Sequence, residues 1–149
     1  MNSDRGLYSN EIEENLKHVN SFKGVVSQDK LELLKAPMKK DFSCIINLED
    51  SNEDGSHWVA LYNDKNENFT EYFDSYGMKP ALQTIGFVKK HFRKSIFYND
   101  NQLQGDNSKK CGYFCQYYIK SRASGKSPYD TLYSLKQEPS KYNEEKVLE

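Results

Sequence analysis

Apolar and polar positions change their period along the chain, from helical to extended and back. The first apolar positions recur every three or four residues, at Ile12, Leu16 and Val19. Asn10 is followed three residues later by Glu13, a spacing typical of a capping box at a helix start. We therefore expect a first helix over residues 10–19, then an extended segment over 22–26 and one or two helical turns over 27–34.

Three consecutive segments then carry the aromatic and β-branched residues that favour strands. They span residues 42–48, 57–62 and 69–73, and each is bounded by Asn, Asp or Gly residues typical of turns. The polar connection 63–68 between the last two segments predicts an antiparallel hairpin. Three neighbouring strands are therefore expected in the middle of the chain.

The second half returns to helical periods, with one more short strand. Leu82, Ile85, Val88 and Phe92 fall on one helical stripe after Pro80. The remaining pattern predicts a strand over 95–98, a polar loop over 102–110, an amphipathic helix from Cys111 to Gly125 and a last helix starting at Ser127. Helices and strands in this order indicate an α+β fold.

Length and charge limit the classes of function. The 149 residues fit a single domain, 1–149, in which the polar stretch 137–149 is expected to be a loosely held tail. Twenty-one basic and 22 acidic residues give a net charge of −1, so nucleic-acid binding is not expected from bulk charge. No apolar run approaches the ~20 residues of a membrane span, and the N-terminus lacks the apolar stretch of a signal peptide. We therefore expect a soluble protein that is not secreted and does not act on a membrane.

The three cysteines are not arranged for disulfides or for a metal. They include no CxxC pair, so we expect neither a disulfide framework nor a zinc site, and a reducing compartment fits best. Cys44 lies inside an apolar strand and Cys115 one turn inside a helix, as small buried hydrophobic residues do.

Cys111 differs from the other two because it begins a helix after a polar loop. Helix N-termini carry a positive dipole end, which favours a thiolate, and the preceding loop predicts exposure. Gly112 beside it allows close approach of another backbone. Cys111 is therefore the candidate nucleophile, although a buried structural cysteine is the alternative interpretation.

His57 and Asp74 are expected to meet at one end of the predicted hairpin. A register that pairs Tyr62 with Phe69 also pairs His57 with Asp74, and the carboxylate would orient the ring and stabilise its protonated form. Taken alone, each has a structural interpretation, a packed histidine and a turn aspartate. Gln104, seven residues before Cys111, could donate with the backbone N–H of Cys111 to an oxyanion.

These residues lie in motifs that resemble one protein family. The motifs are Gly55-Ser-His57-Trp58-Val-Ala, Tyr72-Phe-Asp74-Ser-Tyr-Gly77 and Gln104-Gly-Asp-Asn-Ser-Lys-Lys-Cys111-Gly112-Tyr-Phe-Cys115. Together they resemble the adenovirus protease (adenain) family, which belongs with the sentrin/SUMO-deconjugating cysteine proteases. The small size and the lysine- and asparagine-rich composition are similar to the versions found in Mavirus-like virophages and Maverick/Polinton-type elements.

The resemblance implies a fold and a role for each residue. The implied fold is a central, mostly antiparallel sheet flanked by helices, with the nucleophile at a helix N-terminus. Cys111 would be the nucleophile, His57 its general base, Asp74 the residue that orients the histidine, and Gln104 part of the oxyanion hole. Trp58 would line a narrow cleft that admits small residues, with Gly112 also assigned to substrate binding; a large core aromatic is the alternative interpretation of Trp58.

The sequence departs from the family in two ways. The adenovirus enzyme attaches an activating peptide by disulfide through a cysteine upstream of the glutamine, whereas residues 95–103 contain no cysteine. The C-terminal part is also shorter. We therefore expect no disulfide-linked activating peptide, no DNA requirement and no other cofactor.

The expected function is that of a cysteine endopeptidase. The substrates implied by the resemblance are viral capsid precursor proteins, cut next to small residues such as glycine during particle maturation in the virion and the viral factory of the host cytoplasm. Two alternatives remain open: a protease that removes ubiquitin-like tags, and a non-catalytic module that binds glycine-ended tails. A binding module has no need of a nucleophile, a base, an orienting carboxylate and an oxyanion donor together.

Overall fold

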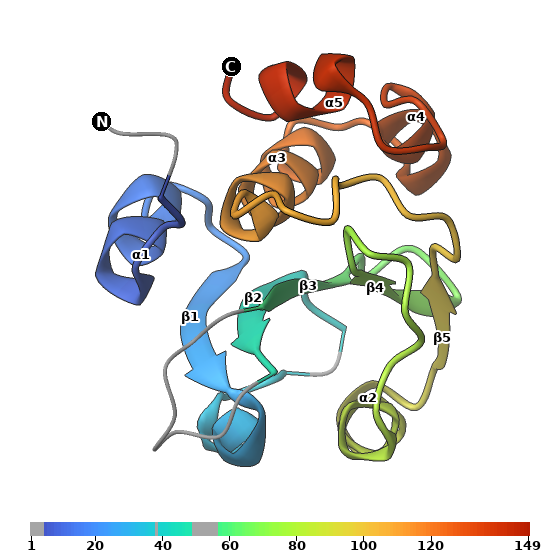
Figure 1. Cartoon of the computed structure of the whole chain (residues 1–149). Helices are drawn as coiled ribbons and strands as arrows, with labels where there is room; N and C mark the ends of the chain where they lie inside the picture. Colours follow the sequence, from blue (N-terminus) through green and yellow to red (C-terminus); the bar gives the residue numbers. More distant parts are fainter. Residues whose placement is uncertain (1–4, 38, 49–56) are drawn as a thin grey trace.

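A five-stranded mixed sheet forms the centre of the molecule (Figure 1). The computed structural model describes residues 5–37, 39–48 and 57–149. The strands are β1 (Phe22–Ser27), β2 (Phe42–Asn47), β3 (Trp58–Asn63), β4 (Phe69–Phe73) and β5 (Ser95–Tyr98), and they lie in this order across the sheet. The three central strands are antiparallel, while β1 and β5 join the edges in parallel. The expected strand segments are therefore confirmed, and the parallel edges make the sheet mixed.

Helices cover both faces of this sheet. They are α1 (Ser9–Leu16), the 3-10 helix η1 (Gln28–Leu33), α2 (Leu82–Phe92), α3 (Cys111–Ala123), α4 (Pro128–Tyr133) and α5 (Lys141–Lys146). Figure 1 shows α2 and η1 on one side of the sheet and the other four helices on the opposite side. The expected α+β class, with helices flanking the sheet and Cys111 at a helix N-terminus, is confirmed.

The alternation of side chains along the strands divides the core into two clusters. In β3, Val59 and Leu61 pack with the aromatic residues of α2, whereas Trp58, Ala60 and Tyr62 face the cluster that contains α3. Successive side chains of a strand point to opposite faces, so a strand buried on both sides is apolar throughout. This is why β3 shows a continuous apolar run.

Two helices differ in detail from the sequence pattern. At α1 the backbone N–H of Tyr8 donates to Glu11 Oε1 over 2.9 Å, so Glu11 rather than Glu13 closes the capping box, and the helix ends at Leu16. In α2 the expected stripe is confirmed at Val88 and Phe92, whereas Leu82 is 86% exposed and Ile85 is only half-buried. The buried residues of α2 are Thr84, Phe87, Val88 and Phe92. The packing partner of a helix, and not its apolar residues alone, selects the buried stripe.

The polar segment expected to be a loosely held tail contains a docked helix. The Ser140 side chain accepts a hydrogen bond from the Asn143 backbone N–H over 3.1 Å and caps α5. Asn143 is fully buried, and Val147 belongs to the core cluster beside α3. The segment is held in place through hydrogen bonds of a polar side chain more than through apolar area.

A buried ion pair fixes α3 on the sheet. Arg122 donates from Nε to Glu71 Oε1 over 2.7 Å and from Nη2 to Glu71 Oε2 over 2.9 Å, and it also bonds Asp64 over 3.0 Å. Tyr118 donates to the same Glu71 carboxylate over 2.6 Å. Glu71 lies in β4, Tyr118 and Arg122 lie in α3, and Asp64 lies in the connection between β3 and β4, so this network holds the second half of α3 against the sheet.

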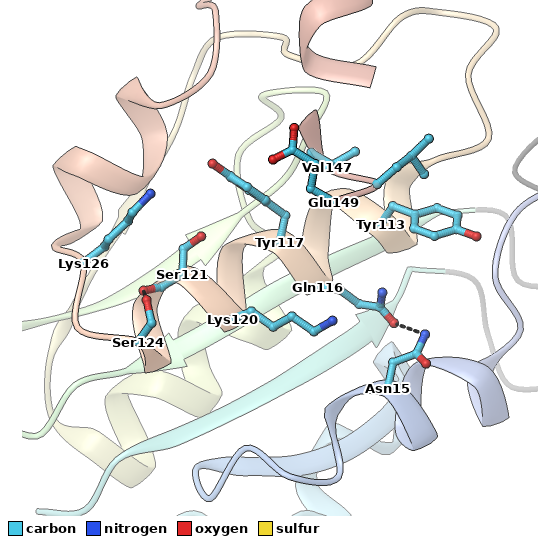
Figure 2. A pocket seen from close by; sticks show the side chains of 11 residues that line it. Asn15, Tyr113, Gln116, Tyr117, Lys120, Ser121, Ser124, Lys126, Val147 and Glu149 are labelled. Carbon is cyan, nitrogen blue, oxygen red and sulfur yellow. Dashed lines mark hydrogen bonds between the residues drawn. The ribbon is translucent and has the colours of Figure 1, made fainter. Parts of the chain in front are cut away.

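On its outer side, α3 borders a cavity of about 620 Å³ (Figure 2). Asn15 of α1 donates to Gln116 of α3 over 3.0 Å at this cavity, and Lys120 and the C-terminal residue Glu149 also line it. Among the described residues, no helix is both long and apolar enough to cross a membrane.

Candidate active site

The structure brings His57 and Asp74 into direct contact. His57 directly precedes β3 and Asp74 directly follows β4. His57 Nε2 and Asp74 Oδ1 lie 2.7 Å apart. A carboxylate only accepts hydrogen bonds, so Nε2 carries the proton of this bond and Nδ1 is the nitrogen left for exchange with another group.

The hairpin register that suggested this contact is wrong by two residues. The strands pair Ala60 with Phe73 and Leu61 with Tyr72, so continuing the same register places Tyr76, not Asp74, opposite His57. The rings of His57 and Tyr76 are indeed in contact, with centroids 4.8 Å apart. A shift by two residues keeps a side chain on the same face of a strand, which is why Asp74 still reaches the histidine as a diagonal neighbour.

His57 also interacts with the thiol of Cys111. Burial of the ring lowers the pKa of His57, but the hydrogen bond to Asp74 and the hydrogen bond and charge of Cys111 outweigh burial and raise the pKa to about 9. Nε2 is occupied by Asp74, so Nδ1, which is buried, is the ring nitrogen available to Cys111. The ring therefore holds a proton at neutral pH, between a carboxylate on one side and a thiol on the other.

Asp74 is held by groups that the sequence patterns did not indicate. Its Oδ1 accepts a second hydrogen bond from the Tyr76 backbone N–H over 2.8 Å. The Asn99 side chain accepts from the Asp74 backbone N–H over 3.1 Å and donates to the Asp74 carbonyl over 2.7 Å. Asn99 follows β5 directly, and only the parallel pairing of β5 with β4 brings it to Asp74.

Gln104 lies fully buried in the loop between β5 and α3. Its Nε2 donates to the Ser108 carbonyl over 2.9 Å, and its Oε1 accepts from the Ser75 hydroxyl over 2.5 Å. A backbone carbonyl can only accept, so these partners fix which end of the amide is nitrogen. Within the described residues the second N–H of this amide has no acceptor, and it is the group that could donate to an oxyanion.

Cys111 begins α3 as expected, but the expected exposure is wrong. The residue is 5% exposed. The N-terminal segment packs closely on the start of α3. A Cβ added at Gly112 would lie 3.3 Å from Leu7 Cβ and 3.4 Å from Ile12 Cδ1. The close neighbours of Gly112 are therefore these side chains and not another backbone, so any contact of Gly112 with substrate would be made by its own main chain.

Trp58 lies beside the site residues in sequence but is packed in the core. It is 7% exposed and belongs to the cluster with α3. This burial fits the interpretation of Trp58 as a core aromatic, and its role as a cleft lining stays a prediction. Gly55 and Ser56, which precede it in the same motif, lie outside the described residues.

The other cysteines lie in the core, as their positions predict. Cys44 and Cys115 are fully buried, and burial raises the pKa of both thiols. Across the described ranges, no group of three or more His, Cys, Asp or Glu side chains could hold a metal ion. The cavity of Figure 2 is lined by none of the predicted site residues, which lie where α3 meets the ends of β3 and β4.

Known proteins share this arrangement of elements. The ASFV pS273R protease superposes with a TM-score of 0.69 over 98% of this chain and 67% of its own, at 18% identity. A second structure of that protease, in selenomethionine form, matches with a TM-score of 0.55 over 70% of this chain and 41% of its own, at 21% identity. These likenesses show that the chain has the fold of that protease, a mixed sheet flanked by helices, and they confirm the expected fold class.

One sequence relative adds information about chemistry. The protein named "Putative thiol protease R355" of Acanthamoeba polyphaga mimivirus is 33% identical over an alignment 99 residues long, which covers 60% of this chain. The match spans 32% of that relative, so this chain corresponds to about a third of its length. No protein-family model matches the chain. The relative is thus named as a thiol protease of a virus, and the solved structures are those of a protease.

Proposed function

We propose that the protein is a cysteine endopeptidase with Cys111 as nucleophile, His57 as acid and base, Asp74 as the orienting carboxylate and Gln104 in the oxyanion hole. The observation that carries this proposal is the position of His57. Its ring is bonded to a buried carboxylate through Nε2 and interacts with a thiol at a helix start. A histidine that only filled space would not need both partners.

The geometry supports a two-step reaction. The sulfur of Cys111, its proton held by His57, forms a bond to the carbonyl carbon of the substrate, and the carbonyl oxygen becomes an oxyanion. The free N–H of Gln104 and the backbone N–H of Cys111 donate to that oxygen. The C–N bond then breaks as His57 gives its proton to the leaving amine, which leaves a thioester on Cys111.

Water completes the cycle. His57, now neutral, takes a proton from a water molecule whose oxygen attacks the thioester carbon. The C–S bond breaks, a carboxylic acid leaves, and the sulfur again lies beside a protonated histidine. Asp74 stays ionised throughout and keeps Nε2 as the protonated nitrogen, so Nδ1 remains the nitrogen that exchanges protons with the reacting groups.

For the substrate, we propose viral capsid precursor proteins cut next to small residues such as glycine. The support is the viral origin of the proteases with which the chain shares its fold and part of its sequence. We further propose that the protein belongs to a virophage or a Maverick/Polinton-type element and acts in the viral factory and the virion. We also propose that it works without a disulfide-linked peptide, because the cysteines in the described part of the chain are all buried.

The test is cleavage of matched substrates. Capsid precursors, a ubiquitin-like conjugate and short peptides with Gly, Ala, Leu or Arg before the scissile bond are incubated with the wild type and with Cys111→Ala. We expect the wild type alone to cut the precursors and the Gly and Ala peptides, with the new termini mapped by mass spectrometry. Equal cleavage by Cys111→Ala would overturn the mechanism, and faster turnover of the conjugate than of the precursors would overturn the substrate class.

A further inference from the structure

Helix α5 contacts the loop of Gln104 on both sides of this residue. The Asn143 side chain donates to the Leu103 carbonyl over 3.1 Å, and a carboxylate oxygen of Glu144 accepts from the Gly105 backbone N–H over 3.2 Å. Leu103 and Gly105 are the two chain neighbours of Gln104. Two consecutive residues of α5 therefore fix the backbone before and after the proposed oxyanion donor.

Glu144 reaches the side-chain amide of Gln104 by a second path. Its other carboxylate oxygen accepts a short hydrogen bond from the Ser108 hydroxyl. The carbonyl of the same Ser108 accepts the Gln104 Nε2 hydrogen bond over 2.9 Å. The Ser108 hydroxyl also accepts from the Lys110 backbone N–H over 3.2 Å, one residue before Cys111, and the Lys110 ammonium lies 3.8 Å from Glu144.

The loop is held both by bonds within it and by bonds to its neighbours. Residues 102–110 form turns without helix or strand. Inside the loop the Ser108 backbone N–H donates to the Gly105 carbonyl over 3.0 Å, and the Gln102 side chain donates to the Gln104 carbonyl over 2.8 Å. The Gly105 N–H and the Ser108 hydroxyl both point to Glu144, and a carboxylate is the acceptor that suits two donors at once. Outside the loop, the Ser75 carbonyl accepts from the backbone N–H groups of Leu103 and Gln104. Glu144, 18% exposed, is the anchor that holds the Gly105 N–H and the Ser108 hydroxyl.

We propose that Glu144 is a positioning residue that sets the oxyanion hole by holding Gly105 and Ser108 around Gln104. This inference rests on the proposed protease function. An oxyanion donor stabilises the transition state only when it lies within about 2.7–3.1 Å of the developing charge. Displacement of such a group by about 1 Å can cost about a hundredfold in rate. Loss of the Glu144 carboxylate is therefore expected to slow the chemical step without weakening substrate binding.

The chain offers a matched control on the same helix. Glu145 is 65% exposed and forms an ion pair over 3.8 Å with Lys141, one turn earlier in α5. Glu145→Ala removes the same charge and the same side-chain length from α5 but touches nothing in the loop. Glu144→Gln is the conservative variant, because its amide can accept from the Gly105 N–H and still bond the Ser108 hydroxyl.

The experiment compares wild type, Glu144→Ala, Glu144→Gln, Glu145→Ala and Ser108→Ala on a peptide with glycine before the scissile bond. We expect Glu144→Ala to lower kcat by about 10- to 100-fold with KM little changed. Glu144→Gln should keep most of the wild-type kcat, and Glu145→Ala all of it. The rate of iodoacetamide alkylation of Cys111 should be the same in all five proteins, because the thiol and His57 do not depend on the anchor.

Two results would overturn the inference: wild-type kcat in Glu144→Ala, or a fall of the alkylation rate in parallel with kcat, which would mean general damage to the site. If Glu144→Ala fails to fold, Ser108→Ala replaces it, since this variant removes the hydroxyl link and leaves the carbonyl in place. An unchanged kcat in Ser108→Ala would then refute the anchor. A wild type that cuts no peptide would instead refute the proposed function, so the two failures are distinguishable.

Discussion

Replacing Asp74 by Asn separates the charge of this residue from its hydrogen bond. The Asn side chain can still accept from His57 Nε2 and from the Tyr76 backbone N–H, which lie 2.7 and 2.8 Å from Asp74 Oδ1. What is lost is the negative charge beside a buried ring. Burial favours the neutral form of an imidazole, so the pKa of His57 must fall in this variant.

The size of the fall follows from the two partners of the ring. Burial lowers the pKa of His57, and Asp74 and Cys111 together raise it to about 9 from an ordinary 6.5, with Asp74 the stronger of the two. The whole rise, from 6.5 to about 9, corresponds to roughly 3 kcal/mol at about 1.4 kcal/mol per pKa unit. We expect the pKa of His57 in the Asp74→Asn variant to lie well below its value in the wild type.

The same change weakens a dependence of stability on pH. The pKa of His57 is higher in the folded protein than in the unfolded chain, so the protonated ring stabilises the fold fully below about pH 6.5, and this contribution is lost as pH rises through about 9. The free energy of unfolding of the wild type should therefore decline between these pH values. In Asp74→Asn the decline should be smaller and should be complete at lower pH.

The assay is an NMR titration of the histidine rings from pH 5 to pH 10, with His57→Ala to assign the signal. His18 and His91 do not contact Asp74, so their signals serve as internal references. A His57 midpoint that is equal in wild type and Asp74→Asn would refute the reasoning. A midpoint near 6.5 in the wild type would refute it as well.

Three further predictions concern the oxyanion donor, the ion pair and the thiols. Gln104→Ala should lower kcat by about 10²- to 10³-fold, as steady-state kinetics would show. It should also lower Tm in a thermal melt, because it leaves buried polar partners unsatisfied. Glu71→Gln should cost about 3–5 kcal/mol in urea unfolding because Arg122 stays buried with less countercharge, whereas Glu14→Gln in the exposed pair on α1 should cost less than about 1 kcal/mol. Iodoacetamide should label Cys111 alone in the folded protein and all three cysteines in urea, and a label on either core cysteine without urea would contradict the structure.

The sequence pattern predicted those parts of the fold that depend on local periodicity. The strands of the central hairpin are bounded by turn residues and are rich in aromatic and β-branched residues, and these features do not depend on the rest of the chain. The histidine and aspartate were found by the same reasoning. The predicted contact is confirmed although the predicted register was wrong, because an error of two residues leaves each side chain on its face of the sheet.

The supports of the site could not be predicted in this way. Asn99 reaches Asp74 only because β5 joins the sheet in parallel, a pairing between distant segments that no local pattern specifies. Helix α5 was missed because Asn143 is a polar residue buried by its hydrogen bonds, and polar composition predicts exposure. The burial of Cys111 depends on the N-terminal segment that packs on Gly112, which is more than 100 residues away in sequence.

The central claim is that substrate is cleaved through a covalent bond to Cys111. An ester of a glycine-ended peptide is mixed with the wild type, quenched in acid within the first turnover, digested and analysed by mass spectrometry. We predict one acyl adduct, a thioester on the peptide that contains Cys111, with none in Cys111→Ala. Turnover without an adduct, or an adduct on another residue, would contradict the account.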